Sequence, residues 1–102
     1  MNQGDIWWGE LPDVPGRPYL VLSRQHAIPV LRTVLAAPVT RTVRGISSEV
    51  PLGSADGLRV ECVASFDNVV TVPKLTFTRK VGALAAGRWP EVCAAVSAAI
   101  DC

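Results

Sequence analysis

The chain has 102 residues, 49% of them hydrophobic, and a formal net charge of +1. This length predicts a single domain over residues 1–102, and a domain this small and apolar is expected to cover part of its surface with a second copy. No segment approaches the ~20 apolar residues of a membrane-spanning helix, and the N-terminus lacks the basic and apolar regions of a signal peptide, so no membrane partner is expected.

Residues 4–11 predict a first strand that carries two adjacent tryptophans, Trp7 and Trp8. Neighbouring residues of a strand point to opposite faces, so the two rings lie on different sides of the sheet. Packing in the core or against a second subunit is the favoured interpretation for both. The alternative is that one of them lies near the surface and stacks on a base of a bound nucleic acid.

The next segments predict a short turn and two strands. Residues 12–16 form the turn because of their proline and glycine content. Residues 17–23 form a buried strand with Arg17 at its entry, because a residue before proline is biased to an extended backbone. After a loop at residues 24–29, residues 30–39 form a third strand whose run of apolar residues on both faces indicates a central position.

The second half of the chain predicts further strands and one helix. Residues 46–52 form a fourth strand, residues 58–72 two strands joined at a kink, and residues 77–84 a last strand. Pro90 suits the first turn of a C-terminal helix. The helix carries an apolar stripe at helical spacing: Val92, Cys93, Val96, Ala99 and Ile100. The expected fold is mainly β, a small barrel with a C-terminal helix.

The three cysteines, Cys62, Cys93 and Cys102, are widely spaced. An odd and sparse set argues against a disulfide framework and for a reducing compartment, so a cytoplasmic protein is expected. We interpret Cys62 and Cys93 as small buried apolar residues and Cys102 as a thiol of the tail. The single histidine, His26, is interpreted as a turn residue, which leaves no ligand set for structural zinc and implies no cofactor.

Basic residues are concentrated in one part of this nearly neutral chain. Between Asp13 and Glu49 there is no acidic residue, yet the interval holds five arginines: Arg17, Arg24, Arg32, Arg41 and Arg44. A local basic surface suits one anionic partner in one place. A solvated basic face without a ligand is the alternative that charge alone leaves open.

Five segments, in this order along nearly the whole chain, resemble the MazF/PemK family of toxin endoribonucleases. They are residues 4–8, 17–23, 37–42, 63–72 and 80–84. The resemblance implies an SH3-like or plasmid-toxin barrel that forms a homodimer. It implies metal-independent, sequence-specific cleavage of single-stranded RNA to 2′,3′-cyclic phosphate and 5′-hydroxyl ends, which inhibits translation. It also implies a MazE-like antitoxin as partner, whose tail occupies the RNA groove.

At the matching positions the resemblance makes Arg17 and Thr40 the catalytic pair. Independently of the family, the single histidine excludes the usual histidine pair for RNA cleavage, and an arginine fork can hold a phosphate with two hydrogen bonds. Arginine is a poor base because its pKa exceeds ~12, so Arg17 is assigned mainly to stabilising negative charge in the transition state. Without the resemblance, Thr40 would be a strand-end hydroxyl that caps the backbone.

Four further residues are expected to contact RNA. Arg41 and Arg44 are predicted to bind phosphates on either side of the cut, which positions the strand without reading its sequence. Asp67 and Asn68 match the family's base-contacting acid–amide pair, although Asp-Asn replaces a more common Glu-Gln, and they could read the edges of unpaired bases. The alternative for this pair is a β-bulge or a turn.

The turn at residues 12–16 is shorter than the mobile loop of many relatives, which bears on substrate selectivity and on antitoxin docking.

Two other functions remain as alternatives to RNA cleavage. One is a non-enzymatic barrel toxin that binds a protein target such as DNA gyrase, and the other is a nucleic-acid-binding barrel without activity. A pure binder has no chemical need for the pair of Arg17 and Thr40, so this pair favours the enzyme.

Overall fold

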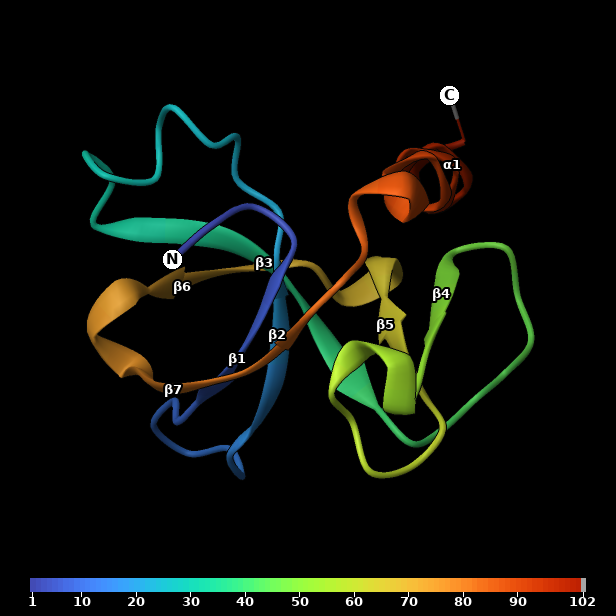
Figure 1. Cartoon of the computed structure of the whole chain (residues 1–102), viewed down its shortest axis with the longest axis horizontal. Helices are drawn as coiled ribbons and strands as arrows, with labels where there is room; N and C mark the ends of the chain where they lie inside the picture. Colours follow the sequence, from blue (N-terminus) through green and yellow to red (C-terminus); the bar gives the residue numbers. More distant parts are fainter. Residues whose placement is uncertain (102) are drawn as a thin grey trace.

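The computed structural model describes residues 1–101 and shows a strongly bent antiparallel sheet with one C-terminal α-helix (Figure 1). The strands are β1 (Asp5–Gly9), β2 (Arg17–Val21), β3 (Thr33–Thr40), β4 (Glu49–Leu52), β5 (Cys62–Ser65), β6 (Val70–Pro73) and β7 (Phe77–Ala83), and the helix is α1 (Trp89–Ile100). Short 3₁₀ turns, η1 (Ser54–Asp56), η2 (Phe66–Asn68), η3 (Lys74–Thr76) and η4 (Ala86–Arg88), connect them. The mainly β architecture with a C-terminal helix is confirmed. No helix in residues 1–101 is long and apolar enough to cross a membrane.

Strand β3 is the centre of the sheet, as its apolar run predicts. The strand order is β4-β5-β3-β2-β1-β7, and β6 also pairs with β3. Three partners share the length of β3: Val34 lies opposite Val72 of β6, Ala37 opposite Leu20 of β2, and Thr40 opposite Val63 of β5. Ala37 belongs to one apolar cluster and Ala36 to the cluster on the other face, so both faces of this part of β3 are buried, which explains the apolar run at residues 34–37.

Two apolar clusters lie on opposite faces of the bent sheet. Because adjacent strand residues alternate between faces, Leu20 enters the cluster beneath α1 and Tyr19 enters the other. The first cluster includes Phe66 and Val92, and α1 lies over the end of the sheet that holds β4 and β5 (Figure 1). Trp7 packs against the second cluster, as predicted for it.

The kink predicted within residues 58–72 is confirmed as η2, which separates β5 from β6. The Phe66 amide donates to the carbonyl oxygen of Ser48 at 3.0 Å, which ties this turn to the start of β4. The side chain of Phe66 is 4% exposed, so the kink is anchored in the core.

Three predicted strands begin later than expected, and the one predicted from residue 58 begins at Cys62. Strand β3 begins at Thr33 instead of residue 30, because residues 24–31 coil into turns whose Ile28 carbonyl accepts a 2.7 Å bond from the Lys74 ammonium group. Strand β4 begins at Glu49 instead of residue 46, because the Glu49 amide bonds back to the Ile46 carbonyl in a turn. His26 lies exposed in the first of these turn regions, as predicted.

The helix begins as predicted, with Pro90 in its first turn, but the predicted stripe is only partly buried. Val92 is 2% exposed, whereas Val96 is 38% and Ile100 is 64% exposed. Cys93 is exposed, so the prediction of a buried residue is wrong for Cys93 and right for Cys62. The sheet covers one face of the helix, and an apolar face remains open.

Candidate active site

Two adjacent cavities share the side chains of Arg17 and Thr40. The larger has a volume of about 330 Å³ and the smaller about 280 Å³. The structure therefore brings together the two residues that the sequence predicts to be catalytic, on the wall between two separate spaces. A substrate that crosses this wall would have a part on either side of the pair.

The change of partner in β3 explains how this wall arises. Tyr19 pairs with Pro38 and Leu20 with Ala37, and the same register carried two residues further places Arg17 across from Thr40. Beyond Pro38, however, β3 turns to β5, where Val39 pairs with Ala64. The ends of β2 and β3 diverge, and the space between them is the larger cavity, which Pro18 and Val39 line.

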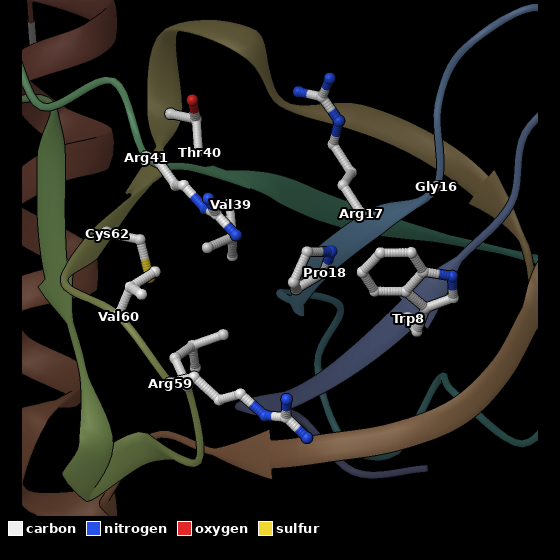
Figure 2. Close-up of a pocket in the computed structure, with 11 residues that line it drawn as sticks. Trp8, Gly16, Arg17, Pro18, Val39, Thr40, Arg41, Arg59, Val60 and Cys62 are labelled. Carbon is white, nitrogen blue, oxygen red and sulfur yellow. The ribbon is translucent and has the colours of Figure 1, made fainter.

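The larger cavity has an apolar floor and arginines around it (Figure 2). The side chain of Arg41 reaches across the cavity over Val39, while Arg59 lies on the side away from Thr40. Arg17 stands at the rim across from Arg41, at the wall that the two cavities share. Within residues 1–101, no acidic residue lines either of these two cavities. The site is thus electrostatically suited to an anion that also carries apolar or aromatic surface.

Trp8, unlike Trp7, belongs to neither core cluster and lines the larger cavity, so the favoured prediction of core packing is not met for Trp8. Its indole nitrogen donates to a Glu10 carboxylate oxygen at 3.2 Å, and the Arg79 guanidinium carbon lies 5.3 Å from the ring centroid. Gly16 leaves room for the ring, because a Cβ at Gly16 would stand 2.8 Å from it. These contacts hold Trp8 as a rigid part of the cavity wall.

The smaller cavity is more polar. Its lining includes Arg44, Ser65 and Asn68, besides the shared pair. The Asn68 side-chain amide donates to the Ser65 hydroxyl at 2.9 Å, which orients Asn68 at the cavity. Asp67 lines neither cavity, and its carboxylate accepts a 2.5 Å bond from the Ser48 hydroxyl. Both residues belong to the turn η2, but the structure places Asn68 beside Arg17 and Thr40 in the smaller cavity and leaves Asp67 outside it.

The loop that carries Arg41 and Arg44 is held by its own hydrogen bonds. The Glu49 carboxylate accepts bonds from the Arg44 amide at 3.1 Å and the Gly45 amide at 3.0 Å. The Thr42 amide donates to the Thr40 hydroxyl oxygen at 3.1 Å. Thr40 therefore does cap the backbone, and because it accepts this bond its own hydroxyl hydrogen remains available to a ligand.

Arg59 and Cys62 also line the larger cavity, and the sequence analysis assigned neither of them a role there. Arg59 was missed because it lies outside the interval that lacks acidic residues, and Cys62 because a buried thiol has no local signal. Burial, and then the nearby Asp56 carboxylate, raise the pKa of the Cys62 thiol, while Arg41 acts in the opposite direction. No group of three or more potential metal-binding side chains lies within residues 1–101.

A model of the PemK-like, MazF-like toxins of type II toxin–antitoxin systems matches residues 2–100. The chain belongs to this family. Probable endoribonuclease MazF5 of Mycobacterium tuberculosis (strain ATCC 25618 / H37Rv) is 39% identical over 101 residues, which cover 98% of this chain and 93% of the relative. Endoribonuclease MazF3 of the same strain is 40% identical over 85 residues, which cover 83% of this chain and 82% of the relative.

Solved MazF structures share the fold. The Mycobacterium tuberculosis toxin MazF-mt6 superposes with a TM-score of 0.89 at 37% identity, over 95% of this chain and 96% of that one. A MazE-MazF structure from Deinococcus radiodurans superposes with a TM-score of 0.80 at 24% identity, over 98% and 94% of the two chains, and this likeness concerns the fold alone. The bent sheet described above is thus the fold of MazF toxins, as the order of sequence motifs predicts.

Proposed function

We propose that this MazF-type toxin is an endoribonuclease that cuts single-stranded RNA at a phosphate bound between Arg17 and Thr40. The observation that carries the proposal is the position of this pair on the wall between two cavities that no acidic residue lines. A phosphodiester joins two nucleosides, so a phosphate on the wall leaves one nucleoside for each cavity. The curated relatives named endoribonucleases support the same activity.

The reaction needs only the RNA, the protein and solvent water. The ribose 2′-oxygen attacks the adjacent phosphorus and gives its proton to water, and the bond from phosphorus to the 5′-oxygen breaks as that oxygen takes a proton from water. The products are a 2′,3′-cyclic phosphate and a 5′-hydroxyl. Arg17 stabilises the negative charge that builds on the phosphate oxygens, and the Thr40 hydroxyl donates to one of them.

The residues that flank Arg17 and Thr40 have two proposed roles: some position the RNA strand and others read its bases. Arg41 in the larger cavity and Arg44 in the smaller bind phosphates on either side of the cut. Asn68 offers an amide to the edge of a base in the smaller cavity, which supports a role in sequence-specific cutting. For Asp67 the base contact stays a prediction, and its bond to Ser48 favours a part in shaping the turn.

We further propose that two copies of the chain associate through the open face of α1. Val96 and Ile100 are 38% and 64% exposed on this helix, and a helix that is apolar on most sides needs cover. A MazE-like antitoxin is the second expected partner, and its tail would compete with RNA for the arginine-lined cavities. We expect the toxin to act in the cytoplasm, because translation takes place there. The sparse cysteines favour the same reducing compartment.

The test is cleavage of a mixed-sequence RNA by the purified protein in the presence of EDTA, with the new ends mapped. Discrete cuts with 5′-hydroxyl ends are expected, and Arg17→Ala should remove them while the protein stays folded. Arg24→Ala is the matched control, because Arg24 is an exposed arginine that lines neither cavity. Cutting by Arg17→Ala at the wild-type rate would refute the assignment, and no cutting by the folded wild type would redirect the search to a protein target such as gyrase.

A further inference from the structure

Arg59 is a cationic side chain of the larger cavity that the function described so far does not use. It belongs to the segment between η1 and β5, far along the chain from Arg17 and Arg41. Figure 2 shows it on the side of the cavity away from Thr40. The arginines thus extend from Arg17 at the shared wall, through Arg41, to Arg59 at the far side.

Arg59 is exposed, and within residues 1–101 none of the ion pairs involves it. The nearest acidic residue along the chain, Glu61, lines a different cavity. The Arg59 guanidinium group is therefore not paired with a carboxylate in residues 1–101, and its N–H groups remain available to donate hydrogen bonds to a ligand.

The backbone that carries Arg59 is held firmly at its start. Gly57 has a φ of +93°, and a Cβ there would stand 2.7 Å from the carbonyl oxygen of Val81 in β7. The Asp56 carboxylate, 5% exposed, accepts a 3.0 Å bond from the Gly53 amide and a 3.2 Å bond from the Arg88 guanidinium group. A segment fixed in this way presents Arg59 with little loss of backbone entropy when a ligand binds.

From these contacts we infer that Arg59 binds a phosphate of the RNA strand beyond the one that is cut, on the larger-cavity side. The inference rests on the proposed function and extends the bound strand through the whole of the larger cavity. Arg59 touches no reacting atom in this assignment, so it contributes to affinity for the strand and leaves the chemical step unchanged.

The test measures binding of a short RNA that contains the mapped cut and carries 2′-deoxyribose at the nucleotide to be cut, so that no attack occurs. Fluorescence anisotropy is recorded for wild type, Arg59→Ala, Arg59→Lys and Arg24→Ala across a range of salt concentrations. For Arg59→Ala we expect affinity to fall about 5-fold or more, and the slope of log affinity against log salt to become less steep by about 0.7, the value for one phosphate on a single strand. Arg59→Lys should recover most of the slope, because the charge is retained.

A result in which Arg59→Ala binds like Arg24→Ala overturns the inference while leaving the proposed function intact, since cutting by wild type is measured separately. Wild-type protein that neither cuts nor binds RNA overturns the proposed function itself. A KM that rises in Arg59→Ala with unchanged kcat supports a binding role, whereas a fall in kcat alone contradicts it.

Discussion

Gly82 of β7 lies so close to Asp56 of η1 that a Cβ built on Gly82 would stand 1.9 Å from the Asp56 carbonyl oxygen. The two backbones meet at an irregularity in the pairing of β1 with β7, where the register shifts between Ile6 and Trp7. No side chain fits at this position, so the contact sets the distance between the sheet and the segment that leads to Arg59.

The substitution Gly82→Ala should therefore push η1 away from β7. We expect a loss of about 1–3 kcal/mol in the free energy of unfolding, typical of an added methyl group in a packed region. For a chain of this size that is a fall of roughly 4–8 °C in Tm for each kcal/mol, measured by thermal unfolding. Gly87→Ala is the control, because a Cβ at Gly87 meets no atom within 4 Å. Equal melting temperatures for the two variants would contradict the role of the contact.

Thr40→Val should reduce the rate of RNA cleavage and leave the fold unchanged. Valine keeps the shape of the side chain but removes the hydroxyl, and with it the donor to the phosphate and the acceptor of the Thr42 amide bond. The loss of one such donor costs about 100-fold in kcat at comparable sites. Thr40→Ser should retain most of the activity because it keeps the hydroxyl. The measurement is kcat on a fluorogenic RNA, and an equal loss in both variants would assign Thr40 to packing alone.

The ion pair between Arg88 and Glu91 at the start of α1 predicts a pH-dependent contribution to stability. The Arg88 guanidinium nitrogen lies 2.9 Å from a Glu91 carboxylate oxygen, and this hydrogen bond is the main cause that holds the pKa of Glu91 below its ordinary value. A lowered pKa in the folded state stabilises the protein above the ordinary pKa of Glu91, and the effect is lost as the pH falls through the folded value.

Glu91→Gln should therefore lower Tm at neutral pH and have no effect at a pH below the pKa of folded Glu91. The pair is on the surface, with the Glu91 side chain 47% exposed, so we expect less than about 1 kcal/mol. Thermal unfolding of both proteins across the acid range checks this, and a difference in Tm that persists undiminished in acid would show that another effect of the substitution dominates.

Ile100→Asp should dissociate the proposed dimer. A charged side chain on the open face of α1 would lose its hydration in the interface without a partner, which is strongly unfavourable. Val30→Asp is the matched control, because Val30 is 82% exposed in the turns at residues 24–31, away from α1. Light scattering or sedimentation should give a monomer for the first variant and a dimer for the second, and a dimer for both would place the interface elsewhere.

The sequence alone was enough for features that depend on neighbouring residues. The apolar run at residues 34–37 predicted the central strand, Pro90 predicted the start of the helix, and the polar pair within residues 58–72 predicted the kink. The order of the five segments was sufficient for the family. The predicted strand starts at residues 30, 46 and 58 were wrong. A distant bond from Lys74 to Ile28 holds the turns before β3, and a local turn bond from Glu49 to Ile46 delays β4.

Only the tertiary structure decided which side chains share a site. Arg17 and Thr40 were paired from sequence by resemblance, and the register of β2 with β3 supplies the physical reason. The exchange of partners along β3 opens the larger cavity, and the contact of Gly82 with Asp56 holds the segment carrying Arg59 beside it. These relationships join residues that are distant in the chain, through strand pairing and backbone contact. Local propensity depends only on neighbouring residues, so it cannot predict either kind of contact.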